Sequence, residues 1–177
     1  MNKKILALVL VVVAAGAAVG FLFYGPSNVS LSIKDPPPQA YDGSITAIVV
    51  SFDKVELHAA NAGNDSGWHT VVTSASVNLM TVLSVSKVLG GAMIPAGRYN
   101  EIRFFASNAS ITIAGVTLTY TIASGGTSGL KVPILGGGFQ VVGGQSLTVQ
   151  LDFAFKNSEI MAGGSLMLSP VVEATVA

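Results

Sequence analysis

Apolar and polar side chains alternate with a period of two along most of the chain after residue 28. The first such run, Val29–Ile33, alternates with serines and ends at Asp35–Pro38, whose prolines cannot continue a sheet and favour an extended polyproline conformation. The most regular run is Leu147–Lys156. This alternation is typical of strands with one buried face, so the pattern predicts a β-rich body.

Further strand candidates lie between turn-forming residues. Ser44–His58 is predicted as one long strand with a β-bulge near Asp53-Lys54, where the apolar phase shifts by one residue. The remaining single strands are predicted over Trp68–Thr73, Arg98–Ser107, Leu130–Ile134 and Ser165–Val176, the last with an edge position or bulge at Pro170.

Two hairpins and one helical stretch complete the pattern. Ser110–Ala114 and Val116–Ile122 flank Gly115, and Phe139–Val142 and Ser146–Phe155 flank Gly143-Gly144, so each pair is expected to form a hairpin. Apolar residues at helical spacing in Val77–Leu89 predict one or two helical turns, ended by Gly90-Gly91. Many short strands without βαβ alternation predict an all-β fold, an antiparallel β-sandwich or a partly open barrel.

The N-terminal segment differs from this body. Lys3-Lys4 precede an uncharged apolar run, Ile5–Phe23. Its length favours an uncleaved membrane anchor with Phe21, Phe23 and Tyr24 at its boundary, because a helix of about 20 residues crosses the hydrocarbon core. The alternative is a secretory signal peptide cleaved near Ala15-Gly16-Ala17 or Ala18-Val19-Gly20.

Both interpretations predict the same organisation. Residues 1–25 form an anchor or signal segment, and residues 26–177 form a single extracytoplasmic β domain, because the two lysines stay on the cytoplasmic side. The chain has no cysteine, which excludes disulfides, zinc–thiolate sites and a lipid-modified cysteine anchor. Seven basic and nine acidic residues remain outside the Lys3-Lys4 pair, without a basic run, so nucleic-acid binding is disfavoured.

Several motifs together resemble a known family. They are Ile33–Pro36, Val55–His58 before a loop and Trp68, Val77–Met80, Ile94–Phe104, Gly129–Pro133, Leu151–Phe153 and Leu168–Val172. Their succession over residues 28–176 resembles a family of bacterial and archaeal exported or envelope proteins catalogued only as a domain of unknown function. The resemblance implies a β-sandwich of carbohydrate-binding, immunoglobulin-like or transthyretin-like type and carries no catalytic residues. The family often has a second acidic residue where this chain has Ala154, which weakens the idea of a shared cation site.

Titratable residues form few constellations. His58 and His69 flank the loop Asn61–Gly67 and are interpreted as exposed hairpin histidines, since a metal site needs a third ligand. Glu101 and Asp152 are expected to pair across strands with Arg103 or Lys156 rather than to face each other in a cleft. The carboxylates outside the N-terminal segment are Asp35, Asp42, Asp53, Asp65, Asp152, Glu56, Glu101, Glu159 and Glu173. We therefore expect a protein that is not an enzyme and uses no metal or cofactor.

Aromatic residues and sequons suggest surface chemistry instead. Trp68, Tyr99 and Tyr120 are candidates for a sugar-stacking platform, with packing of Trp68 into the core or over a sandwich edge as the favoured alternative. Glycosylation sequons begin at Asn28, Asn64 and Asn108, and the loop position of Asn64 suits modification best.

Three functional hypotheses follow from these patterns. The first is a membrane-anchored surface module with a structural or adhesive role, binding an envelope protein or, as a carbohydrate-binding module, a glycan. The second is a self-assembling filament subunit in which the strand Val29–Ile33 completes a neighbour's sheet, which a cleaved signal would favour. The third, an enzyme, is disfavoured.

Overall fold

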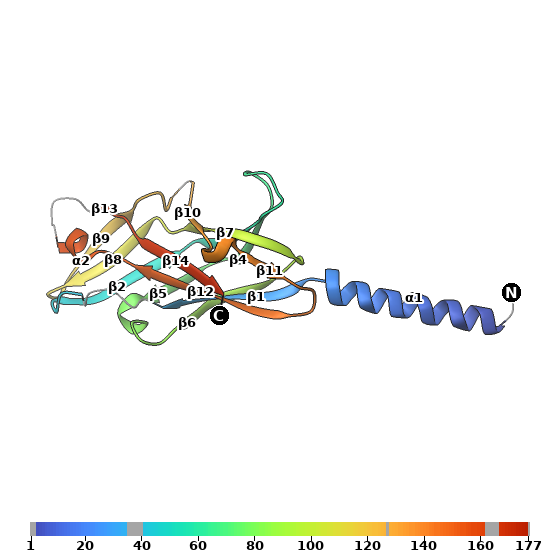
Figure 1. Cartoon of the computed structure of the whole chain (residues 1–177). Coiled ribbons are helices and arrows are strands. Elements are labelled where there is room, and N and C mark those ends of the chain that lie inside the picture. The colour runs from blue at the N-terminus through green and yellow to red at the C-terminus, as the bar shows by residue number, and fades with distance from the viewer. Residues whose placement is uncertain (1–2, 35–40, 127, 162–166, 177) are drawn as a thin grey trace.

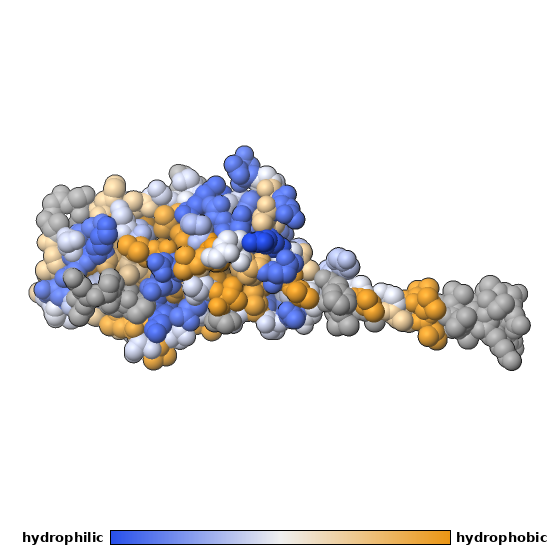
Figure 2. Space-filling model, in the orientation of Figure 1, coloured by the Kyte–Doolittle hydropathy of each residue, from blue (hydrophilic) through white to orange (hydrophobic). Residues whose placement is uncertain are grey.

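The computed structural model describes residues 3–34, 41–126, 128–161 and 167–176. An N-terminal helix, α1 (Lys3–Tyr24), extends from one end of an elongated β body (Figure 1). Its Leu10–Val13 side chains are exposed, and Figure 2 shows them as a hydrophobic patch outside the body. Among the residues described, no helix combines the length and the apolar character required to cross a membrane. The side chains of Phe21 and Phe23 lie outside the described part.

The body is all-β, as the alternation predicts, and in the part of the chain that the structure describes its strands form three sheets. Sheet A has the order β14 (Val171–Val176), β12 (Ser146–Ala154), β1 (Ser27–Lys34) and β6 (Lys87–Ile94). Sheet B has the order β13 (Met167–Leu168), β9 (Val116–Ile122), β8 (Asn108–Ile113), β2 (Ile45–Phe52) and β5 (Ala75–Asn78). Sheet C has the order β10 (Leu130–Pro133), β7 (Gly97–Phe105), β3 (Lys54–Ala59) and β4 (Trp68–Val72), and β11 (Phe139–Val141) also pairs with β7.

One hydrophobic core lies between the three sheets. At its centre Phe52 of sheet B, Phe104 of sheet C and Phe153 of sheet A contact one another, with ring centroids 5.6–6.1 Å apart. Aromatic pairs at this separation contribute about 0.5–1.5 kcal/mol beyond their buried area. The three rings come from β2, β7 and β12, one strand of each sheet, so their contacts stabilise the packing of the three sheets on one another.

The sheets are not wholly antiparallel, in contrast to the sequence-based expectation. β1 pairs with β12 in parallel from Asn28–Ser146 to Lys34–Asp152, and β13 pairs with β9 in parallel. Parallel neighbours need a long connection, and almost the whole domain lies between β1 and β12. The alternation within each strand carries no information on such a distant partner.

The predicted strand Ser44–His58 is two strands in two sheets. β2 belongs to sheet B and β3 to sheet C, and the chain passes between them at Asp53, whose N–H donates to the Phe105 carbonyl at 2.7 Å. The predicted bulge is therefore a change of sheet. The phase shift at this point has a simple cause, because the apolar side chains of both strands must face the same core.

Two other local predictions differ from the structure. One helical turn is present in Val77–Leu89, as a 3-10 turn (Leu79–Thr81) capped by the Asn78 side chain, but β6 begins at Lys87 and runs through Gly90-Gly91, so the predicted end of the helix there is wrong. A Cβ at Gly91 would lie 3.0 Å from the Val29 carbonyl oxygen, so this glycine lets β6 lie close against β1. The expected hairpin of Phe139–Val142 with Ser146–Phe155 does not form, because β11 pairs with β7 and β12 with β1.

The β8–β9 hairpin is confirmed. Ala114 and Gly115, both with positive φ (48° and 82°), form its two-residue turn. A short helix, α2 (Asn157–Met161), follows β12 at the end of the body away from α1 (Figure 1). The predicted break at Asp35–Pro38 and the start of the last strand at Ser165 lie outside the described residues.

Candidate functional site

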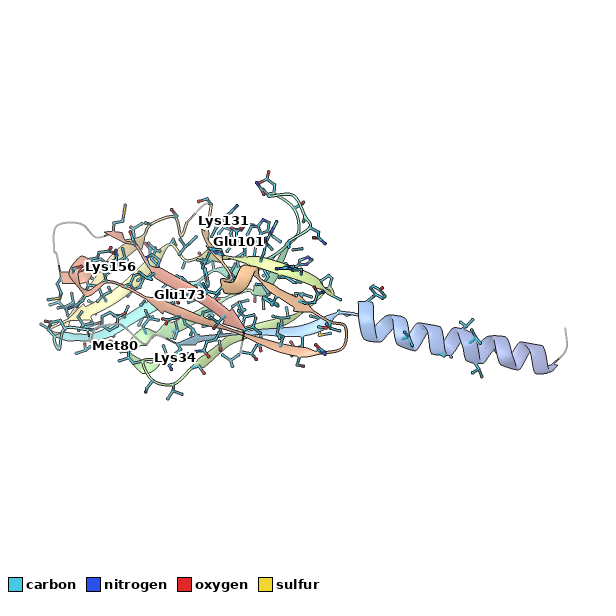
Figure 3. The ribbon with its side chains drawn as sticks, in the orientation of Figure 1. Lys34, Met80, Glu101, Lys131, Lys156 and Glu173 are labelled. Atoms are coloured by element: carbon cyan, nitrogen blue, oxygen red, sulfur yellow. The ribbon has the colours of Figure 1, made fainter. Side chains whose placement is uncertain are left out.

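The outer face of sheet C carries the densest group of charged and aromatic side chains. On β3 and β7, Val55, Leu57, Ile102 and Phe104 point into the core, so the residues between them point outward. The strand registers place four outward residues in one row across the sheet: Thr70, Glu56, Arg103 and Lys131. Figure 3 shows Lys131 and Glu101 on this side of the body.

Glu56 is the electrostatic centre of this row and is only 5% exposed. Its Oε2 accepts hydrogen bonds from Nε (3.0 Å) and Nη2 (2.6 Å) of Arg103, and its Oε1 accepts from Lys54 Nζ (2.8 Å) and Thr70 Oγ1 (3.3 Å). Burial alone would raise the pKa of Glu56, but the hydrogen bonds and charges of Lys54 and Arg103 outweigh it and lower the pKa. Glu56 is therefore an ionised carboxylate that fixes two cations.

Trp68 lies beneath one of these cations. The Arg103 guanidinium carbon is 4.0 Å from the Trp68 ring centroid, and Lys131 Nζ is 5.4 Å from it. The His58 ring lies 4.6 Å from the Trp68 ring, and the indole N–H donates to the Asn64 carbonyl at 3.0 Å. Trp68 is thus held on the outer face of the sheet, where it packs against His58 and beneath Arg103.

Phe105 forms a second aromatic platform beside the first. Lys54 Nζ lies 4.4 Å and the Arg103 guanidinium carbon 5.0 Å from its ring centroid. Gly129, with φ +69°, lies over the Arg103 stem, and a Cβ there would approach Arg103 Cγ to 2.6 Å. We define the Trp68 cluster by the residues that these contacts join: Lys54, Glu56, His58, Trp68, Arg103, Phe105 and Lys131.

The Trp68 cluster presents cations rather than a bare aromatic plane. The Lys54 side chain is 41% exposed and that of Arg103 20% exposed, while Lys131 is exposed. Trp68 lies partly buried on β4, at the edge of sheet C, and the Arg103 guanidinium lies over its ring. Tyr99 and Tyr120 are buried and donate to the carbonyls of Pro95 and Ile160, so neither belongs to a sugar-stacking platform.

The two histidines point to opposite faces of sheet C. His58 pairs with Trp68 in the register and lies on the outer face, whereas His69 packs against the buried Tyr99. His58 is buried, contrary to the expected exposed position, and its ring nitrogens lie 3.4 Å from Asn100 Oδ1 and 3.1 Å from the Gly63 carbonyl. In the described part of the chain, no three His, Asp or Glu side chains are grouped to hold a metal ion.

The predicted pairing of Glu101 or Asp152 with Arg103 or Lys156 is wrong, because both cations pair with other carboxylates. Arg103 pairs with Glu56 instead of Glu101, and the salt bridge of Lys156 is with Glu159, at 3.7 Å. Asp152 lies in sheet A, opposite Glu173 on β14 and Lys34 on β1. Burial and the Glu173 charge raise the pKa of Asp152, while Lys34 opposes the shift.

Sequence reasoning missed Glu56 as the centre of the site. It lies between two core residues in the Val55–His58 motif, and alternation places it on an outer face, which is normally solvated. The three sequon asparagines are exposed: Asn28 on β1, Asn64 in the β3–β4 loop and Asn108 on β8. Asn64 is adjacent to the Trp68 cluster through its carbonyl.

Comparison with known proteins identifies a family and no nearer relative. A family described as "Domain of unknown function (DUF4382)" matches residues 26–170. No curated protein and no solved structure matches the chain. The resemblance to a family catalogued only as a domain of unknown function is thereby confirmed.

Proposed function

The chain belongs to the DUF4382 family of domains of unknown function, and we propose that it is an exported, membrane-tethered adhesive module that binds an anionic surface polymer. Its body is a β-sandwich of immunoglobulin-like or transthyretin-like type. The Trp68 cluster is the binding surface. The observation that carries the proposal is the arrangement of three cations over two aromatic rings on one outer sheet face, two of them (Lys54 and Arg103) held by the buried carboxylate of Glu56.

The tether is supported by the N-terminal sequence. The run Ile5–Phe23 is apolar and follows Lys3-Lys4, the charge order of a segment whose C-terminal side is exported. Only Gly25 and Pro26 separate α1 from β1, so the body begins directly at the end of this segment. An aromatic residue, Tyr24, lies at the junction, where interfacial aromatics are common in anchors.

The choice of an anionic polymer follows from the local charge. Lys54, Arg103 and Lys131 carry three positive charges on this face, against Glu56 within the cluster and Glu101 in the adjacent row. The face is therefore positive on a body that has more acidic than basic residues. Glu56 holds both Arg103 and Lys54, so the exposed Lys131 and the part-exposed Lys54 side chain offer the outward cations for carboxylate or sulfate groups.

A polymer-binding experiment tests this assignment. Full-length protein in detergent micelles is titrated with hyaluronan, an acidic polysaccharide, and with neutral dextran. We expect binding to hyaluronan alone, weakened by salt, and a loss of about tenfold in the Lys54→Gln/Lys131→Gln variant, equivalent to about 1.4 kcal/mol. The matched control is Lys87→Gln, an exposed lysine on β6. Equal binding of both polymers, absence of binding, or an equal loss in Lys87→Gln would contradict the proposal.

The filament alternative has one specific observation in its favour. β1 is the first strand of the body, yet it occupies a central position between β12 and β6, so the same position in a neighbour would accept it. Strand exchange of this kind predicts sedimentable filaments in the native host and a chain that lacks the N-terminal segment. A monomeric body at high protein concentration would argue against it.

A further inference from the structure

The strand that follows α1 is held on both sides. β1 pairs with β12 in parallel and with β6 in an antiparallel register that extends from Ser27–Ile94 to Ile33–Lys87. α1 extends from the start of β1, and β12 ends next to α2 at the opposite end of the body (Figure 1). A pull on α1 therefore acts on the N-terminal end of β1. The C-terminal end of β12 lies at the opposite end of the body, next to α2.

This arrangement loads the β1–β12 ladder in shear. Ladder hydrogen bonds run across the strands, so a force along the strand axis acts on all of them at once. A force that separates two adjacent strand ends instead breaks the bonds one after another. Each bond contributes about 1 kcal/mol net, so resistance depends on how many must break together. Because β1 and β12 are parallel from Asn28 to Lys34, a pull on the N-terminal end of β1 and a pull on the C-terminal end of β12 draw the two strands past each other in opposite directions.

Side chains and loop contacts reinforce the same seam. Ser30 Oγ lies 3.1 Å from Thr148 Oγ1 and 3.3 Å from the Leu147 carbonyl oxygen, which links the two strands a second time. Where the chain enters the body, the turn 142–145 holds it. Asn28 N–H donates to the Gln145 carbonyl at 3.1 Å, the Gly144 N–H donates to the Pro26 carbonyl at 3.4 Å, and Ser27 Oγ donates to the Val142 carbonyl.

The core opposes the sliding of β1 as well. Val29, Leu31 and Ile33 are fully buried, and each would leave its core position if β1 moved along its axis. Exposing one such side chain costs about 1.5–3 kcal/mol. On the β6 side, Gly91 lets the two backbones approach so closely that a Cβ there would lie 3.2 Å from the Ser30 Cα.

From these features we propose that the β1–β12 seam is a mechanical clamp, which lets the body resist a pull applied between the membrane segment α1 and the opposite end of the body at α2. The proposal rests on the tether of the proposed function but not on the identity of the ligand. It assigns to β1 a load-bearing role in addition to its place in the core. An adhesive module that resists a pull along β1 keeps its binding face folded under load.

Single-molecule force spectroscopy tests the clamp. The chain has no cysteine, so the full-length protein accepts handles at two introduced ones. Tyr24→Cys with Ser158→Cys on α2 loads β1 and β12 at opposite ends, and Tyr24→Cys with Gln145→Cys peels their adjacent ends apart; all three positions are exposed. We expect an unfolding force several times higher in the first geometry. Equal forces in the two geometries would overturn the proposal.

A second pair of variants separates the clamp from general stability. Ser30→Ala/Thr148→Val should lower the force in the first geometry by more than the matched Thr112→Val/Thr117→Val, which removes a hydroxyl pair 2.9 Å apart on the β8–β9 hairpin. Urea unfolding of both variants gives the equilibrium loss for comparison. An equal force drop in the two variants would contradict the clamp. None of these outcomes depends on whether the native protein retains its N-terminal segment, so failure of the clamp and failure of the tether are distinguishable.

Discussion

Neutralising Glu56 is the most informative perturbation of the Trp68 cluster. Glu56→Gln keeps the shape of the side chain but removes the charge that holds Arg103 and Lys54. Breaking a fully buried ion pair costs about 3–5 kcal/mol, whereas exposed pairs contribute about 0–1 kcal/mol. Arg103 is 20% and Lys54 41% exposed, so we expect the free energy of unfolding to fall by about 2 kcal/mol at pH 7.

A double-mutant cycle isolates the Glu56–Arg103 term. Arg103→Met keeps the aliphatic stem over Trp68, and we expect the two changes to couple by about 1.5 kcal/mol. Unfolding in urea is followed by circular dichroism and by the fluorescence of Trp68, the single tryptophan of the chain. Additive effects of the two substitutions would show that the geometry described here does not stabilise the sheet.

The pH dependence gives an independent check with a definite sign. The pKa of Glu56 is lowered from its ordinary value of 4.5, so its contribution is fully present above pH 4.5 and is lost as the pH falls through the folded-state pKa. The stability gap between the wild type and Glu56→Gln should therefore shrink in acid. A gap below about 0.5 kcal/mol at pH 7, or one that stays constant into acid, would refute the reasoning.

Three further predictions concern stability and use urea unfolding as the assay. Gly91→Ala should cost about 1–2 kcal/mol because its Cβ meets the main chain of β1, whereas Gly126→Ala, with open space around it, should be nearly neutral. Asp152→Asn should raise the free energy of unfolding at pH 7, because burial and the Glu173 charge both disfavour the ionised Asp152; the Lys34 charge and solvent screening keep this gain to about 0.5 kcal/mol, and because the pKa of Asp152 is raised the gain disappears in acid. Tyr120→Phe should cost about 1 kcal/mol through loss of the hydrogen bond to a carbonyl of α2, and a neutral effect would show that this bond does not stabilise the fold.

The alternation of apolar and polar residues predicts where most strands lie but not which strands pair with one another. The buried side chains of β1, β7, β8 and β12 follow the alternation in the sequence, because each strand has one face on the core. The parallel pairing of β1 with β12 depends on residues more than one hundred positions apart, and no local signal specifies it. The sequence locates the shift of the apolar phase near Asp53 but predicts a β-bulge there. A bulge and a change of sheet shift the apolar phase in the same way, so the sequence alone does not distinguish them.

Of the candidate site, the sequence predicts Trp68 as a binding residue but neither the other members of the Trp68 cluster nor their arrangement. The residue type of Trp68 makes it a candidate, and Arg103 is expected only as a partner of Glu101 or Asp152; the stacking of the two requires the register of β4, β3 and β7. Glu56 was overlooked because an outward-facing carboxylate on a strand is normally solvated. Here Glu56 is buried and bonded to Arg103, Lys54 and Thr70, and these partners come together only through the folded register and packing of the strands.

The central claim, a body tethered to the membrane by its own N-terminal segment, is tested most directly by intact-mass spectrometry of the protein from membrane and medium fractions of its native host. We predict a mass that includes the run Ile5–Phe23, found only with membranes, and additional hexose mass if the sequon at Asn64 is used. A mass that starts after Ala17 or Gly20, recovered from the medium, would contradict the tether and favour the strand-exchange filament.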